Sequence, residues 1–164
     1  MLFLLDSDTL IQAKNEYYGF DLCPGFWDWL DRKTGEAVVA SVEPVLTELA
    51  AGNDELKAWA QARSKTFFKA MDEAAANAAK DVVTWVMSQP FREDAKQRFL
   101  AGVDPLLIAY AKAHGNTVAT HEVYTEGERR NVKIPAVCAA FNIPCVRLIH
   151  LLRQHGARFV LEKG

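Results

Sequence analysis

The sequence predicts a single α/β domain, residues 1–164, built on a mainly parallel β-sheet. A chain of 164 residues has room for one hydrophobic core of ordinary size. Half of the residues are hydrophobic and 24% are charged, a composition typical of globular domains and not of disordered chains. Short apolar runs alternate with longer stretches of helical composition, and this alternation favours parallel strands that are connected by helices.

The expected strands are short, continuous apolar runs, because strands of a parallel sheet are buried on both faces. The first covers residues 2–5 and ends at Asp6. Further strands are expected at residues 37–40, 117–120, 145–146 and 159–161. Residues 53–100 show no strand pattern and are rich in strong helix formers, so they are expected to fold into two or three helices. Within them, the alanine tract of residues 74–79 predicts close helix packing.

Two helix starts can be predicted from capping residues. Ser41 is expected to cap a helix with Pro44 in its first turn. Asp104 is expected to cap a second helix, with Pro105 at the first helical position and Gly115 at the end. Both helices would begin at the carboxyl edge of the predicted sheet.

Charge and cysteine content limit the function classes. The chain has 19 Lys and Arg against 21 Asp and Glu, a net charge of -2, so no large basic surface points to a nucleic-acid-binding protein. If four acids serve a metal site, however, the rest of the chain carries +2. Three cysteines without a Cys-x-x-Cys pair argue against a disulfide framework or a structural zinc site.

No targeting or membrane segment is expected. The apolar run at residues 1–5 is too short for a signal peptide and lacks a basic lead, and no run approaches the length of a membrane span. The sequence therefore predicts a cytoplasmic protein without a membrane partner.

Four acids are expected to face one pocket. Asp6 closes the first strand and Glu122 lies just beyond the strand at 117–120, so both belong to the carboxyl edge of the sheet, where open α/β sheets bind ligands. Asp104 starts a helix that leaves this edge. Glu48 lies roughly 10 Å along its helix, and its long side chain points back toward the helix start.

Such a cluster of carboxylates requires a cation. Two unit charges about 4 Å apart repel by roughly 4 kcal/mol at an effective dielectric constant of 20. Carboxylate and water oxygens suit Mg²⁺ or Mn²⁺, and a pair of such ions can clamp the attacking and leaving oxygens of a phosphodiester. The predicted chemistry is phosphodiester hydrolysis.

The same acids lie in motifs that resemble those of PIN domains. The motifs are Leu4-Leu5-Asp6-Ser7, Glu48-Leu49, the run from Asp104 to Ala111, and Val118-Ala119-Thr120-His121-Glu122. The resemblance spans roughly residues 1–147. PIN domains are metal-dependent nucleases with a three-layer α/β fold, and many bacterial members are VapC-type toxins of toxin-antitoxin pairs.

A further resemblance concerns residues 14–20 and 23–30, which are similar to a subfamily of small bacterial PIN-like proteins. That subfamily has Thr-His-Glu where other PIN domains have an aspartate. The resemblance implies a Mg²⁺- or Mn²⁺-dependent endoribonuclease with RNA as substrate and a cognate antitoxin as partner, and it leaves a homodimer open. It also implies that Asp6, Glu48, Asp104 and Glu122 are both the catalytic residues and the metal ligands.

Other side chains are candidates for supporting roles. Ser7 and Thr120 are expected to contact the ligands and not the metal, and Asp8 is expected either to do the same or to serve as an extra ligand. The candidates for RNA binding are Lys14, His121, Arg129, Arg130 and Lys133. Ordinary surface or structural roles remain open for all five.

Two other functions remain as alternatives. The segment Asp6-Ser7-Asp8 is similar to the opening of haloacid-dehalogenase-type phosphatases, in which the first aspartate is a nucleophile. A PIN-like scaffold that binds RNA or protein without cutting is the other.

Overall fold

A computed structural model describes residues 1–163. Its sheet contains β1 (Phe3–Leu5), β2 (Val39–Val42), β3 (Phe68–Lys69), β4 (Thr117–Thr120) and β5 (Cys145–Arg147). The helices before β4 are α1 (Ser7–Gln12), α2 (Pro24–Gly35), α3 (Glu43–Ala50), α4 (Glu55–Ala62), α5 (Glu73–Ser88), α6 (Glu93–Ala101) and α7 (Asp104–His114). The helices after it are α8 (Ile134–Ala140) and α9 (Leu148–Gln154), and a π-helical turn (Ala13–Tyr17) extends α1.

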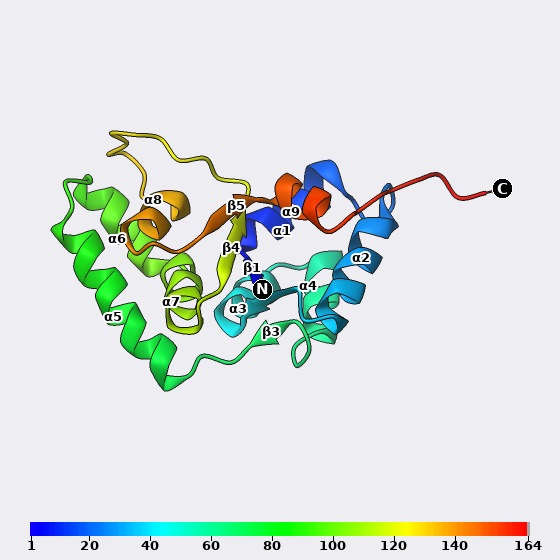
Figure 1. The fold of residues 1–164 in the computed structure, drawn as a ribbon, viewed down its shortest axis with the longest axis horizontal. Coiled ribbons are helices and arrows are strands. Elements are labelled where there is room, and N and C mark those ends of the chain that lie inside the picture. The colour runs from blue at the N-terminus through cyan, green and yellow to red at the C-terminus, as the bar shows by residue number, and fades with distance from the viewer. Residues whose placement is uncertain (164) are drawn as a thin grey trace.

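All five strands are parallel, in the order β3-β2-β1-β4-β5, which confirms the predicted α/β class. The central strand is β1, and Phe3 pairs with Val39 on one side and with Thr117 on the other. Figure 1 shows three layers, with α5, α6, α7 and α8 on one side of the sheet and α2, α4 and α9 on the other. The carboxyl ends of β1 and β4 therefore lie side by side.

The longest helix, α5, packs against α7 and not directly on the sheet. Ala75 and Ala78 are buried in this contact region, and small side chains at helical spacing allow two helices to approach closely. The close packing that the alanine tract predicts is confirmed. The predicted helical stretch at 53–100 contains three helices, as expected, but it also contains one strand.

That strand, β3, corrects the prediction that residues 53–100 hold no strand. It has only two residues, and it pairs with β2 through Ser41 and Phe68. A two-residue strand is too short to produce an apolar run. Thr66 and Phe67 before it favour strands, but Lys65, Lys69 and Ala70 around this short run favour helix, so the pattern does not indicate a strand.

Two predicted boundaries move by a short distance. The strand that was expected at 37–40 begins at Val39, because Ala37 has a positive φ of 57° and its amide still closes the end of α2 on Thr34. Ser41 does not cap α3: it is a buried residue of β2, and its hydroxyl donates to the Leu5 carbonyl at 2.6 Å. The residue that precedes α3 is Val42.

Asp104 is the first residue of α7 and not its N-cap, a position that Val103 takes. Pro105 therefore occupies the second helical position, still in the first turn, where its missing amide costs nothing. Gly115 ends the helix as predicted, with φ 66° in the left-handed region.

The strand expected at 159–161 is wrong. The ring of Phe159 lies near Tyr18 and Phe26, with centroids 5.7 and 6.2 Å apart, instead of extending the sheet. Val160 and Leu161 are 76% and 94% exposed, and Figure 1 shows this end of the chain leading away from the domain. No helix within residues 1–163 is both long and apolar enough to cross a membrane.

Candidate functional site

Asp6 is the most deeply buried acid at the carboxyl edge of the sheet. It follows β1 directly and is fully buried. Its Oδ1 accepts a hydrogen bond from the Thr9 hydroxyl, whereas its buried Oδ2 has no hydrogen-bond partner among residues 1–163. Burial raises the pKa of Asp6 well above its usual range, the Thr9 hydrogen bond lowers it in part, and the charges of Asp104, Glu122 and Asp8 raise it further.

Asp104 lies in the same electrostatic environment at the start of α7. Burial raises its pKa from 3.8 to about 7, and the charges of Glu122, Asp8 and Glu48 contribute to the increase. No lysine or arginine among residues 1–163 is a main contributor to the pKa of Asp6 or Asp104. These two carboxyls therefore share one poorly neutralised region.

Glu122 has two contacts beyond the end of β4. Its Oε2 accepts the backbone N–H of Ile134, the first residue of α8, at 2.7 Å, and its own N–H donates to the Thr120 hydroxyl at 3.2 Å. Burial raises the pKa of Glu122, and the hydrogen bond from Ile134 and the charges of His121 and Lys133 lower it in part. Thr120 thus contacts the backbone of Glu122, and its role behind a metal ligand stays a prediction.

Asp8 and Glu48 are exposed members of the cluster. Glu48 Oε2 accepts a hydrogen bond of 2.6 Å from the buried Ser7 hydroxyl, so α3 is tied to the start of α1 at this point. The charge of Asp8 raises the pKa values of Asp6, Asp104 and Glu122. The charge of Asp8 thus affects the pKa of more carboxyls in the site than the charge of Glu48 does.

The sequence analysis missed Thr9, which connects two parts of the site. Its hydroxyl donates to Asp6 Oδ1, accepts the backbone N–H of His121 at 3.1 Å, and lies 3.2 Å from Nδ1 of the same histidine. The Thr9 hydroxyl has one proton, and it donates this proton to Asp6. The imidazole of His121 can therefore hydrogen-bond to Thr9 only by donating from Nδ1–H to the hydroxyl oxygen. A threonine three residues after an acid at a helix start is the signal that could have revealed it.

The predicted RNA-binding cations differ in their surroundings. Lys14 forms an ion pair with Asp54 at 3.2 Å, so its charge is largely neutralised. Arg129 and Arg130 are exposed and form no ion pair within residues 1–163. Lys133 Nζ donates to the Thr125 hydroxyl at 3.2 Å, and the charge of Lys133 lowers the pKa of Glu122.

The carboxylate oxygens of this cluster are the kind of ligand that a hard divalent cation prefers, but they do not surround a single position. Among residues 1–163 no three His, Cys, Asp or Glu side chains are arranged so that they could hold one ion. The buried Asp6 Oδ2 without a partner and the raised pKa values of three carboxyls nevertheless indicate a place where positive charge would be bound favourably. The residues present fit Mg²⁺ or Mn²⁺ in chemistry.

The strand order, the three layers and the acids at the ends of β1 and β4 define a PIN-like α/β domain. The chain belongs to the family described as "Domain of unknown function (DUF4411)", whose sequence profile matches residues 3–159. No curated protein sequence matches this chain. The predicted PIN-like fold is confirmed by the similarity to two solved structures.

Two solved structures are similar to the whole domain. VapBC2 from Rickettsia felis, bound to a DNA fragment from its promoter, has a TM-score of 0.55 and 12% identity over 90% of this chain and 98% of that chain. FitAcB from Neisseria gonorrhoeae has a TM-score of 0.52 and 18% identity over 89% of this chain and 96% of that chain. At these identities the similarity concerns the fold.

Proposed function

We propose that this protein is a Mg²⁺- or Mn²⁺-dependent endoribonuclease and the toxin of a bacterial toxin-antitoxin pair. The observation that carries the proposal is the state of Asp6. A fully buried carboxylate with one oxygen that has no partner, close to three other acids, is unfavourable unless a cation or a proton compensates it. The edge of a parallel sheet beside β1 and β4 is also where this class of fold binds its ligands.

In the proposed mechanism the protein's own residues hold and orient the reacting groups. Asp6 and Asp104 would hold the ion from two elements, β1 and α7, and Glu122 would contribute its free Oε1. When it is bound, a divalent ion supplies Lewis acidity that activates water and offsets the negative charge that develops on the phosphate. Asp8 and Glu48, which are exposed, would approach the site from its open side.

The metal-binding part is tested by asparagine substitution at Asp6 or Asp104, with Asp28→Asn, an exposed acid on α2, as the matched control. Mn²⁺ should raise the melting temperature of the wild type and of Asp28→Asn, because a ligand that binds the folded state stabilises it. It should have little effect on Asp6→Asn or Asp104→Asn. An equal Mn²⁺ effect in all four proteins would contradict this site.

The nuclease part is tested with single-stranded RNA on denaturing gels. Wild type and Asp28→Asn should cut RNA only when Mg²⁺ or Mn²⁺ is present, and Asp6→Asn should be at least about 100-fold slower, as expected when a ligand to a catalytic metal is lost. RNA cleavage at the wild-type rate by Asp6→Asn would refute the proposal. RNA binding without any cleavage by the wild type would instead support the non-cleaving scaffold.

The toxin role is supported by the motif resemblance and by the similarity in fold to VapBC2 and FitAcB. Induced expression of the wild type should stop bacterial growth, and Asp6→Asn should not. A cognate antitoxin is expected to restore growth by covering the acid cluster. Equal toxicity of the wild type and Asp6→Asn would show that the growth effect does not depend on the acid cluster.

A further inference from the structure

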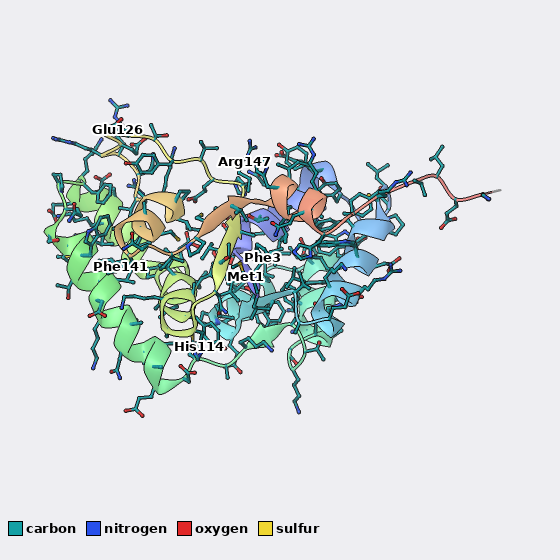
Figure 2. The ribbon with its side chains drawn as sticks, viewed as in Figure 1. Met1, Phe3, His114, Glu126, Phe141 and Arg147 are labelled. Atoms are coloured by element: carbon teal, nitrogen blue, oxygen red, sulfur yellow. The ribbon has the colours of Figure 1, made fainter. Side chains whose placement is uncertain are left out.

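A groove beside the acid cluster has no role in the proposed chemistry. It lies between the end of α5, the loop of residues 121–133 and α8, and it has a volume of about 380 Å³. Figure 1 shows this loop, in yellow, arching over α8 toward α6, and Glu126, labelled in Figure 2, lies near its outer end. The lining includes the aromatic side chains of Trp85, Phe91 and Tyr124, the basic ones of Arg129 and Lys133, and one acid, Glu128.

The loop that forms one wall is held by backbone hydrogen bonds. The N–H of Arg92 donates to the carbonyl of Arg129 at 2.9 Å, and the Arg98 guanidinium donates to the carbonyl of Arg130 at 3.0 Å. The Glu128 carboxylate accepts the N–H of Arg130 at 2.8 Å. These bonds occupy the main chain of the loop, so the side chains of Arg129 and Arg130 remain available to a ligand.

Aromatic surface comes from both walls, from Tyr124 in the loop and from Trp85 on α5. Tyr124 is 55% exposed, and Trp85 is partly exposed with its ring centroid 6.2 Å from that of Phe91. The other three tryptophans of the chain are buried. Aromatic faces and unpaired cations together match the two parts of a single-stranded nucleotide, whose base stacks and whose phosphate is negatively charged.

One residue connects the groove with the acid cluster. Lys133 lines the groove, and its charge also lowers the pKa of Glu122. The next residue, Ile134, donates its N–H to the Glu122 carboxylate. The lining of the groove therefore comes within one residue along the chain of a contact to Glu122.

We infer that this groove binds an unpaired segment of the RNA substrate, with one base against Trp85 and Tyr124 and the adjoining phosphates against Arg129 and Lys133. The inference rests on the proposed nuclease function and adds that the substrate is single-stranded beside the cut. A duplex would not fit, because its bases are stacked on one another and present no free face to an aromatic ring.

Binding is measured with Asp6→Asn, which separates RNA affinity from cleavage. A fluorescein-labelled 12-nucleotide single-stranded RNA reports affinity by anisotropy, and unlabelled RNA reports contact with Trp85 by quenching of tryptophan fluorescence. We expect quenching that is lost in Trp85→Phe. Tyr124→Ala and Arg129→Gln should each weaken binding at least about fivefold, the lower end for a stacked base.

Matched controls are available at the other end of the molecule. Tyr17→Ala removes an exposed tyrosine and Arg32→Gln an exposed arginine, both far from the groove along the chain, and both should bind RNA as the parent does. The duplex form of the same RNA should bind at least about fivefold more weakly. Equal affinity for duplex and single strand, or unchanged affinity in Tyr124→Ala and Arg129→Gln, would overturn the inference.

Steady-state cleavage by the wild type distinguishes the two proposals. If the wild type cuts RNA and Tyr124→Ala raises KM with little change in kcat, both proposals hold. If the wild type cuts RNA and the groove variants keep the wild-type KM, only the groove assignment fails. If RNA quenches Trp85 but the wild type never cuts, the nuclease proposal fails and the groove assignment stands. Quenching by a purified antitoxin and not by RNA would overturn the groove assignment in favour of a protein partner.

Discussion

Single side chains show how far the site could be predicted. The positions of Asp6, Asp104 and Glu122 follow from strand ends and a helix start, because the carboxyl ends of parallel strands share one edge. The contacts of Thr9 and the reach of Asp8 could not be predicted, since they depend on how individual side chains turn in three dimensions. The prediction of four equal ligands accordingly stays a prediction.

Replacing Thr9 with valine should weaken both stability and activity. Valine has the same shape but no hydroxyl, so Asp6 Oδ1 and the N–H of His121 both lose a partner. An unsatisfied buried polar group costs about 1–3 kcal/mol. Urea unfolding should show a loss in this range, and Thr9→Ser, which keeps the hydroxyl, should recover most of it. Full stability in the valine variant would contradict the described contacts.

The raised pKa of Asp104 predicts that the metal-free protein loses stability as pH rises. Its pKa is about 7 in the folded state against 3.8 unfolded, so between these values the folded state binds more protons. The free energy of unfolding therefore falls with pH across this window. One pKa unit corresponds to about 1.4 kcal/mol. In EDTA, thermal unfolding at pH 5.5 and pH 8 should show the decrease, and Asp104→Asn should reduce it; a flat profile in the wild type would argue against the raised pKa.

At the scale of elements, strands that produce an apolar run were predictable, including the three-residue β1 and β5, and the two-residue β3 was not. The strand at 117–120 and the end of α7 at Gly115 agree with the prediction because each has a local sequence cause. The two-residue β3 depends on pairing with β2, and the start of β2 depends on how α2 ends. Such features are decided by neighbours in space, which the sequence pattern does not contain.

Glu122 should have separable structural and catalytic roles. Its carboxylate accepts the N–H that begins α8. Glu122→Gln keeps an acceptor oxygen for Ile134 but removes the charge, so it should keep most of the stability while losing RNA cleavage. Glu122→Ala removes the acceptor as well and should cost about 1 kcal/mol more, the usual cost of losing a helix cap. Equal unfolding free energies for the two variants would show that the bond to Ile134 contributes nothing.

At the scale of the whole molecule, the fold class and the PIN-like architecture were predictable because short apolar runs alternate with helical stretches along the chain and acidic motifs follow the strands. The end of the chain was not. The apolar residues at 159–161 resemble a strand, but the sheet ends at β5 and Phe159 packs on the aromatic cluster of α2 instead. Composition alone does not show whether such an apolar segment pairs with the sheet or packs on a helix.

Deleting the chain from Val160 onward should therefore change stability little, because Val160 and Leu161 are exposed. Phe159→Ala should cost about 1 kcal/mol, the typical contribution of an aromatic pair plus some apolar burial. Thermal unfolding of the two variants side by side tests this contrast. A large loss on deletion with a neutral Phe159→Ala would mean that the tail pairs with the sheet after all.

The central place of β1 has a consequence for protein synthesis. The strand emerges first from the ribosome, but its neighbours β2 and β4 and the acids Asp104 and Glu122 are translated much later. A nascent chain cannot form these non-local pairings until most of the polypeptide is available. A prematurely terminated chain that ends before Ile134 also lacks the amide that anchors Glu122. The acid cluster with its contact to α8 can therefore assemble only after Ile134 has been translated.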